Sequence, residues 1–257
     1  MAQRSELAAR DLVAGGRRVM VLTGAGISTD SGIPDFRGPN GVWTRNPDAE
    51  KAAHLSHYLS DRDVRVASWR NRLAWSWDAR PNPGHAAVSA FDATGRLGAV
   101  ATQNIDGLHQ AAGLPAERVI EVHGSIRETV CWSCGDRRPM AETLERVRAG
   151  EEDPECLAGG PTGRCGGILK SATISFGQSL DPEVLMRAEH EARSCDVMVA
   201  VGSSLTVHPA AGLVPLARRT GAALVIVNAE DTPYDGIADV VVRTPISQSL
   251  PVILADT

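Results

Sequence analysis

The chain has few aromatic residues, no long apolar run and no excess of basic charge. Five Trp, three Phe and two Tyr are the only aromatic residues among 257. No segment approaches the roughly 18 consecutive apolar residues of a membrane-spanning helix, so we expect no association with a membrane. The net charge of −5 and the pI of about 5.8 argue against a general nucleic-acid-binding protein, which would carry a basic excess.

Cysteine is scarce as well, and its number is odd. There are five cysteines, and the N-terminus lacks the apolar core of a signal peptide. This combination favours free thiols and metal ligands over disulfides, and a cytoplasmic location is expected. Hydrophobic residues make up 43% of the chain and charged residues 22%, which is ordinary for a globular protein with a sizeable core.

Short apolar, β-branched runs recur along the chain and predict buried strands. They are Val19–Leu22, Ala99–Thr102, Val119–Val122, Val197–Val201, Leu224–Val227 and Val240–Val242. Helix-like stretches at Pro83–Ala93, Asp181–Arg193 and Pro209–Arg219 separate several of them. Asp181 before Pro182 indicates a helix start, since Asp caps the first amides and Pro fits the first turn. Buried strands alternating with helices predict an α/β fold with a doubly wound, parallel, Rossmann-like sheet.

Two regions interrupt this alternation and predict a smaller second lobe. Residues 38–81 are polar and contain no strand-like run, so we expect a helical insertion there. Residues 128–169 hold four of the five cysteines and a helix-like stretch at Ala141–Ala149. The expected division is a Rossmann-like domain of residues 1–37, 82–127 and 170–257, with the two insertions forming the lobe.

The four clustered cysteines predict a structural zinc site. Cys131 and Cys134 form a C-x-x-C knuckle, and Cys156 and Cys165 follow after 21 and 8 further residues. Four thiolates fill every position of a tetrahedral Zn²⁺, which leaves no room for a substrate or water. Cys195 stands beside the apolar run that follows it and is expected to be a buried small hydrophobe.

The first strand runs into Gly24-Ala25-Gly26, which is typical of a loop that approaches a phosphate closely. This loop lacks the third glycine of the usual dinucleotide fingerprint, and no acidic strand end follows about twenty residues later. His123 directly follows the Val119–Val122 strand, at the sheet edge where such folds bind ligands, and is the candidate general base. His85 and His109 lie in helix-like stretches and are expected to have core or capping roles.

Two classes of protein would account for some of these features. An NAD-dependent oxidoreductase with a structural zinc would account for the glycine loop and the cysteines. It would leave Asp35-Phe36-Arg37 and Gln103-Asn104-Ile105-Asp106 without a purpose. A zinc-ribbon scaffold that binds a protein or nucleic acid is a non-enzymatic reading, and the acidic pI argues against its nucleic-acid version.

Five strings in order along the chain resemble the sirtuins, the NAD-dependent protein-lysine deacylases of bacterial type. They are T-G-A-G-I-S-T-D-S-G-I-P-D-F-R-G at Thr23–Gly38, T-Q-N-I-D-G-L-H at Thr102–His109, V-H-G-S at Val122–Ser125, G-S-S-L-T-V at Gly202–Val207 and I-V-N at Ile226–Asn228. The resemblance covers the whole chain. It implies transfer of the acetyl or other acyl group of a protein lysine to ADP-ribose, with release of nicotinamide. Mono-ADP-ribosyl transfer, or removal of longer or acidic acyl groups, is the alternative within the family.

The resemblance also implies a set of site residues. His123 would accept a proton from a ribose hydroxyl, and Phe36 would shield the reactive ribose carbon from water. The zinc held by the four cysteines would take no part in the chemistry. The residues implied to bind NAD are Gly24, Ala25, Gly26, Ser28, Thr29, Asp35, Phe36, Arg37, Gln103, Asn104, Ile105, Asp106, Gly202, Ser203, Ser204, Asn228, Glu230 and Ile246.

The partner implied is a protein or peptide with an acetylated or otherwise acylated lysine. It would lie as an added strand against Ser175–Gln178 and Ser204–Val207. The family's K-P-x-V-V-F-F-G-E is K-S-A-T-I-S-F-G-Q at Lys170–Gln178 in this chain, with departures at Ser171, Ser175 and Gln178. Relatives that prefer acidic acyl groups carry Y-x-x-R, where this chain has W-R-N-R at Trp69–Arg72, so acetyl-lysine is the expected substrate.

Overall fold

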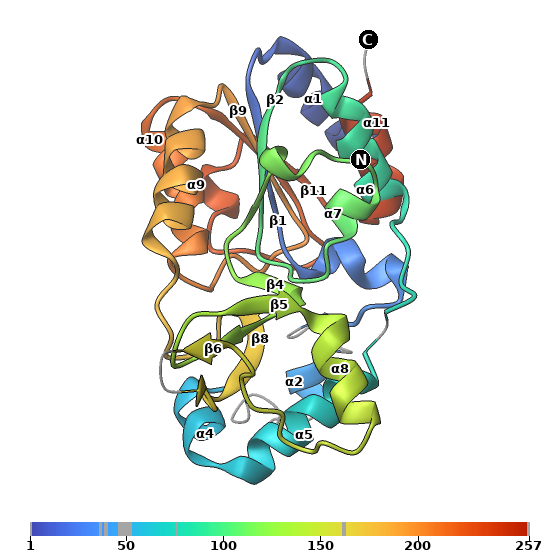
Figure 1. The fold of residues 1–257 in the computed structure, drawn as a ribbon. Coiled ribbons are helices and arrows are strands. Elements are labelled where there is room, and N and C mark those ends of the chain that lie inside the picture. Colours follow the sequence, from blue (N-terminus) through green and yellow to red (C-terminus); the bar gives the residue numbers. More distant parts are fainter. Residues whose placement is uncertain are drawn as a thin grey trace.

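The computed structural model describes residues 2–35, 38, 41–45, 53–75, 77–160 and 163–255. Figure 1 shows a large lobe built on one central sheet and a small lobe stacked against one end of it. Within the described residues, no helix has the length and apolar character needed to cross a membrane.

The large lobe is built on a six-stranded sheet in the order β11-β10-β9-β1-β2-β3. All neighbouring pairs are parallel. Each of the six predicted runs forms one of these strands, so the predicted doubly wound α/β fold is confirmed. The strands are β1 Val19–Thr23, β2 Leu97–Thr102, β3 Val119–Glu121, β9 Val197–Val201, β10 Ala223–Val227 and β11 Val240–Val242.

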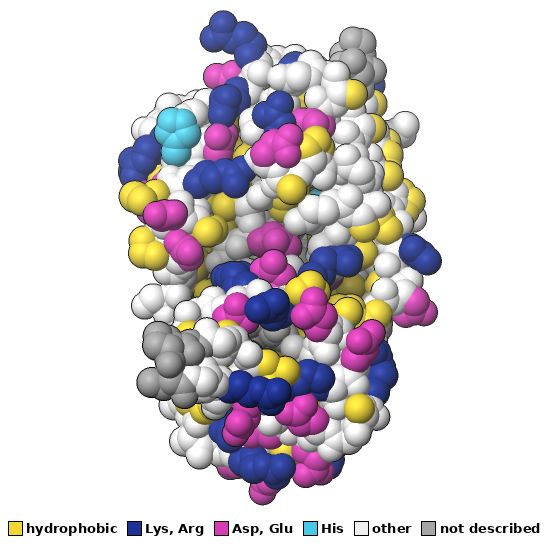
Figure 2. All heavy atoms as spheres, viewed as in Figure 1, with side chains coloured by type: hydrophobic (Ala, Val, Ile, Leu, Met, Phe, Trp, Pro, Cys, Tyr) yellow, Lys and Arg dark blue, Asp and Glu magenta, His cyan; other side chains and the backbone are white. Residues whose placement is uncertain are grey.

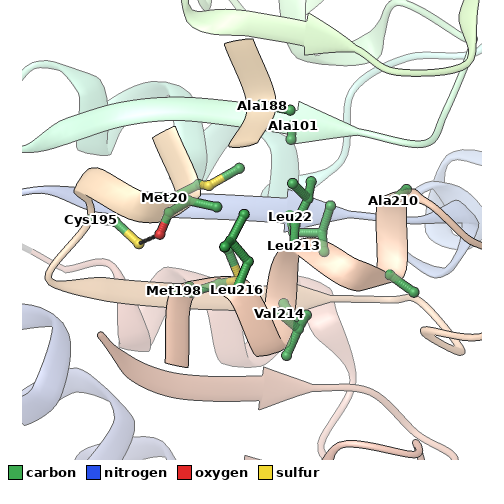
Figure 3. Packing of buried hydrophobic residues seen from close by; sticks show 14 of the residues in the cluster. Met20, Leu22, Ala101, Ala188, Cys195, Met198, Ala210, Leu213, Val214 and Leu216 are labelled. Atoms are coloured by element: carbon green, nitrogen blue, oxygen red, sulfur yellow. Dashed lines mark hydrogen bonds between the residues drawn. The ribbon is translucent and has the colours of Figure 1, made fainter. Parts of the chain in front are cut away.

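Helices cover both faces of this sheet because successive side chains of a strand point to opposite faces. Met20 and Leu22 of β1 pack with α9 (Pro182–Ser194) and α10 (Leu213–Arg219) in one apolar cluster (Figure 3). Val19 and Val21 pack in a second cluster with the helices of the other face. Those helices are α1 Ala2–Gly15, α6 Pro83–Asp92 and α11 Ile246–Ile253.

Shorter helical turns connect these elements. They are η1 Ala25–Ser31, α7 Leu108–Ala111, η2 Ala116–Arg118, η3 Ala210–Gly212 and η4 Asp235–Ile237. The predicted cap at Asp181 is confirmed, since its carboxylate accepts hydrogen bonds from the amides of Glu183 and Val184. The helix expected from Pro209 begins instead as the 3₁₀ turn η3, and the α-helix starts at Leu213.

The small lobe contains an antiparallel sheet, which the sequence analysis did not predict. Its strand order is β5-β4-β8, and its strands are β4 Gly124–Cys131, β5 Arg137–Pro139 and β8 Leu169–Thr173. The predicted domain boundaries at 127/128 and 169/170 fall inside β4 and β8. The division into domains stays a prediction, and the pairing of these strands would move both boundaries.

Helices and a hairpin complete the small lobe (Figure 1). Trp69 is 1% exposed and packs with Met140, Leu144 and two of the clustered cysteines in a separate core. On the face seen in Figure 2, acidic and basic side chains intermingle over this lobe. The remaining elements are α2 Val42–Arg45, α4 Leu55–Ser60, α5 Arg62–Leu73, α8 Met140–Arg148, β6 Gly159–Gly160 and β7 Gly163–Arg164.

Candidate active site

The candidate site lies where β1, β2 and β9 end. Thr23, Thr102 and Val201 are in register at their carboxyl ends, so the loops after these three strands meet at one edge of the sheet. Open parallel sheets bind ligands at this edge. The loops carry most of the NAD-binding residues expected from the sequence.

Glycines allow two of these loops to touch through their backbones. The amide of Gly26 donates to the carbonyl of Gly202 over 2.8 Å, and the amide of Gly24 donates to Val201 O over 2.9 Å. A Cβ on Gly26 would lie 2.7 Å from the Cα of Gly202, and a Cβ on Gly202 would lie 2.5 Å from the amide nitrogen of Ile27. Gly202 also has a φ of 61°. Packing between the loops therefore requires glycine at these positions, before any ligand is considered.

Asn104 and Asp106 join the loop after β2 to the loop after β1. The side-chain nitrogen of Asn104, Nδ2, donates to Gly24 O and to Ser28 Oγ, each over 3.1 Å. Ser28 Oγ donates in turn to Asp106 Oδ2 over 2.8 Å. The other carboxylate oxygen of Asp106 accepts from the amide of Leu108 at the start of α7. The side chains of Asn104 and Asp106 are thus joined through Ser28, and both are fixed against the loop after β1.

His123 is fixed in one tautomer by the backbone. Its Nδ1 lies 3.0 Å from the carbonyl oxygen of Gln103, which can only accept, so Nδ1 carries the proton and Nε2 is left as the basic atom. The side chain of Gln103 donates to Ser203 Oγ over 2.8 Å. Burial lowers the pKa of His123 below its ordinary value of 6.5, and the bond to Gln103 opposes this effect. The ring is therefore a neutral base at physiological pH.

A buried hydroxyl chain beneath the site was missed by the sequence analysis. Thr23 Oγ1 donates to Thr102 Oγ1 over 2.8 Å and accepts from His109 Nε2 over 3.0 Å. Burial lowers the pKa of His109 to about 3 and that of His85 to about 4, so both rings are neutral. A polar Thr closing an apolar strand run was the available signal. The expected capping role is confirmed for His85, which forms a capping box with Asn82 at the start of α6.

The four predicted cysteines come together in the small lobe. Their sulfur atoms all lie within 4.8 Å of one another, and Cys131–Cys165 and Cys134–Cys156 are each separated by 3.7 Å. Zn–S bonds of about 2.3 Å give a tetrahedron with edges of about 3.8 Å. Gly135 and Gly166 have φ values of 75° and 62°, the conformation that lets a chain turn sharply after a ligand. The spacing of the four sulfur atoms therefore fits coordination of one zinc ion, and sulfur atoms 3.7 Å apart are too far from one another to form a disulfide.

Comparison with known proteins assigns a family to this arrangement. A model described as the Sir2 family matches residues 24–209. NAD-dependent protein deacetylase 2 of Streptomyces coelicolor is 52% identical over 92% of this chain and 96% of its own length. The chain belongs to the Sir2 family. NAD-dependent protein deacetylase 1 of Bradyrhizobium diazoefficiens is 42% identical over 93% of this chain and 91% of its own length.

Solved structures of Sir2 enzymes have the same fold. One, described as the structural basis for the mechanism and regulation of Sir2 enzymes, has a TM-score of 0.86 at 38% identity and covers 99% of this chain and 97% of its own. A Sir2 complex with deacetylated p53 peptide and 3'-O-acetyl-ADP-ribose has a TM-score of 0.86 at 31% identity, covering 99% of this chain and 98% of its own.

The remaining described residues expected from the Sir2 resemblance lie away from the contacts between the loops after β1, β2 and β9. Phe36 and Arg37 lie outside the described residues. Asp35 accepts from the amide of Gly38 over 2.9 Å. The Asn228 amide nitrogen donates to Glu230 O over 2.9 Å, and Ile246 starts α11 and packs on the second apolar cluster. The NAD-binding roles of these residues, like those of the residues in the loops after β1, β2 and β9, stay predictions.

The segment Ser175–Gln178, predicted to bind the substrate peptide and called here the predicted peptide loop, borders a hollow of about 560 Å³. This hollow extends from the zinc module to the start of α9. Apolar Leu55, Trp132 and Leu180 line this hollow together with Gln178. On the side of the loop that faces the helical insertion, the backbone amide of Phe176 donates to Ala53 O over 3.1 Å. The carbonyl oxygen of Phe176 accepts from the amide of Leu55 over 3.0 Å. The loop is thus anchored to the helical insertion on one side and open to the hollow.

Proposed function

We propose that this chain is an NAD-dependent protein-lysine deacetylase. It would consume NAD⁺ as a co-substrate together with one water molecule and transfer the acetyl group of a modified lysine to ADP-ribose, releasing nicotinamide and the free lysine. The observation that carries the proposal is the position of His123. Its Nδ1 proton is held by Gln103 O, while the Gln103 side chain reaches Ser203 on the loop after β9. The base and both loops are thereby joined in one rigid unit.

The residues of this chain have separable tasks in the proposed reaction. The acetyl oxygen of the bound lysine would form a bond to the ribose carbon as the bond from that carbon to nicotinamide breaks. Nε2 of His123 would then take the proton from the neighbouring ribose hydroxyl, so that the hydroxyl oxygen attacks the acyl carbon, and addition of water would release the lysine amine and leave the acetyl group on ADP-ribose. Asn104 and Asp106 would orient the nicotinamide and the ribose. The loops around Gly24 and Gly202 would hold the phosphates. This division agrees with the buried, preorganised network, since fixed dipoles need little reorganisation during reaction.

Zinc would be held by Cys131, Cys134, Cys156 and Cys165, and would stabilise the small lobe without entering the reaction. Four sulfur ligands complete the coordination shell of the ion. The cluster belongs to the core that contains Trp69, so the metal would keep β4 and α8 against α5.

The partner in this proposal is a protein or peptide with an acetylated lysine, bound beside Ser175–Gln178. Solved Sir2 structures support it, because they include complexes with acetylated and propionylated peptides. A cytoplasmic location belongs to the same proposal, since the four zinc-binding thiols require a reducing compartment.

The proposal is tested by nicotinamide release. Purified protein with NAD⁺ should release nicotinamide in a one-to-one ratio with peptide deacetylation, and only when the peptide is acetylated. An oxidoreductase would instead change the absorbance of reduced cofactor with a suitable alcohol. An ADP-ribosyltransferase would release nicotinamide while leaving the acetyl group on the peptide. Either of these outcomes would replace the proposed function.

A further inference from the structure

Lys170 is a buried cation that no carboxylate neutralises within the described residues. It lies on β8 and is 3% exposed. Its ammonium group donates to the carbonyls of Ser171 and Thr173 and to the side-chain oxygen of Gln178, which is 3.3 Å away. A buried charge normally has an ionic partner. Three neutral oxygens take that place here.

The charged groups around Lys170 are basic. Burial, followed by the positive charges of Arg72 on α5 and Arg137 on β5, lowers the pKa of Lys170 to about 8. Arg72 donates from Nε to Ser171 Oγ over 2.8 Å, and Arg137 pairs with Glu128 over 2.8 Å. The Tyr58 hydroxyl of α4 donates to Leu169 O over 2.7 Å, and burial raises its pKa, so it stays neutral.

Two of the oxygens that Lys170 holds belong to the segment leading into the predicted peptide loop, and the third belongs to Gln178 at the end of that loop. Gln178 Oε1 accepts from Lys170 and also from the amide of Ser175 over 3.2 Å. The amide of Gln178 donates back to Ser175 O over 3.0 Å. The lysine therefore supports, from the buried side, a tight turn whose other side lines the open hollow.

We propose that Lys170 is a positioning residue for the substrate peptide: its ammonium group, through Thr173 O and Gln178, holds the Ser175–Gln178 loop in the shape that binds the acylated segment. This inference rests on the proposed deacetylase function. An ammonium group has three N–H donors for three acceptors, whereas the neutral amine has two. Loss of the proton therefore releases one acceptor. The bond to Gln178, longer than the 3.0 Å bond to Ser171 O, is the one expected to break.

The titration of Lys170 can be followed directly because the chain has only two lysines, Lys51 and Lys170. In a Lys51→Arg protein labelled with ¹³C at lysine Cε, the single remaining signal reports Lys170. Its midpoint should lie near pH 8. Gln178→Glu places a carboxylate beside the ammonium group and should raise the midpoint by about one unit or more. A midpoint near 10.4, the ordinary value for lysine, would show that burial does not lower this pKa; the ammonium form would then persist through the measured range, and Lys170→Met would decide the inference.

The functional test measures KM for a capped acetyl-lysine peptide with no other titratable group, at saturating NAD⁺, between pH 6.5 and 9.5. We expect the peptide KM to rise about fivefold with increasing pH, because one hydrogen bond is lost. The midpoint of this rise should coincide with the NMR midpoint of Lys170. In Gln178→Glu the rise should move to higher pH by the same amount as the NMR midpoint. The KM for NAD⁺ should show no such rise in either protein.

Lys170→Met separates positioning from a merely structural role. It should raise the peptide KM by about tenfold at pH 7.5 while the KM for NAD⁺ stays within about twofold. If this variant does not fold, the Gln178→Glu comparison decides the question alone. A wild-type protein that does not deacetylate refutes the proposed function. A wild-type protein that deacetylates with a peptide KM independent of the Lys170 titration refutes this inference and leaves the function standing.

Discussion

At the scale of single residues, the site depends on fixing one ring and two loops. His123 has its tautomer set by a backbone carbonyl, so no separate carboxylate is needed to orient it. Gly26 and Gly202 are close enough that neither tolerates a Cβ without movement. From the sequence, the need for glycine in these loops is attributed to close approach of a phosphate. The sequence could not show that the neighbouring loop imposes the same requirement, since Gly202 is far away along the chain.

His123→Ala should abolish acetyl transfer while leaving NAD⁺ binding largely intact. A positioned general base contributes typically about 10²–10⁴-fold, and the proposed phosphate contacts lie on other loops. Peptide turnover and calorimetry with NAD⁺ measure the two effects separately. His190→Ala, at an exposed position of α9, is the matched control and should behave as wild type. Near-normal turnover by His123→Ala would remove this residue from its proposed role.

The pH profile should report the depressed pKa of His123. Burial disfavours the charged ring, so the neutral, active form persists to lower pH than for an exposed histidine. Activity is lost only as the pH falls through this lowered pKa. The acid limb of kcat/KM should therefore have its midpoint below the ordinary value of 6.5. A midpoint at or above 6.5 would show that His123 is charged more easily than its burial implies.

At the scale of elements, the apolar runs predicted the central strands because parallel strands buried on both faces are continuously hydrophobic. The small antiparallel sheet escaped prediction. Strand β4 mixes buried and exposed residues without strict alternation, and β5 is exposed along its whole length. Such strands exist through pairing and through the clustered cysteines rather than through hydrophobic pattern. Local periodicity therefore could not reveal them.

One zinc ion per chain should be required for the folded small lobe. Cys131 is buried in the core that contains Trp69, and binding of structural zinc contributes roughly 10–16 kcal/mol to folding in small modules. The Cys131→Ala variant should lose the metal, and plasma emission measures the zinc content. It should also unfold β4 and α8, which hydrogen exchange would show as loss of amide protection in these two elements. Cys195→Ala is the control: this cysteine lies in a different cluster and its removal should leave one equivalent of metal. A metal-free, stable and active wild-type protein would contradict the assignment.

At the scale of the whole molecule, the edge of the large sheet that carries the proposed base and the proposed peptide loop of the small lobe are linked directly. The amide of Ile174 donates to His123 O over 2.8 Å, so the chain that leads to the peptide loop starts beside the proposed base. The sequence predicted both ends of this link through their motifs. It could not predict the link itself, because β3 and β8 are separated by the entire cysteine module.

Acetyl-lysine should be preferred over succinyl-lysine. Trp69, at the position where acid-specific relatives carry Tyr, is buried against the zinc module, and Arg72 is engaged with Ser171 Oγ and lies over the Trp75 ring. Neither is arranged to bind a distal carboxylate. Parallel kinetics on one peptide carrying either modification give the comparison. A kcat/KM about tenfold higher for the succinyl form, equivalent to about 1.4 kcal/mol, would show that Arg72 binds the acid.

The most direct test of the account is mass spectrometry of an acetyl-lysine peptide incubated with NAD⁺ and the purified protein. We expect three products in equal amounts: the peptide lighter by one acetyl group, nicotinamide, and ADP-ribose heavier by one acetyl group. His123→Ala should yield none of them above background. Loss of the acetyl group without NAD⁺, or with free acetate and no acetylated ADP-ribose, would contradict the central claim.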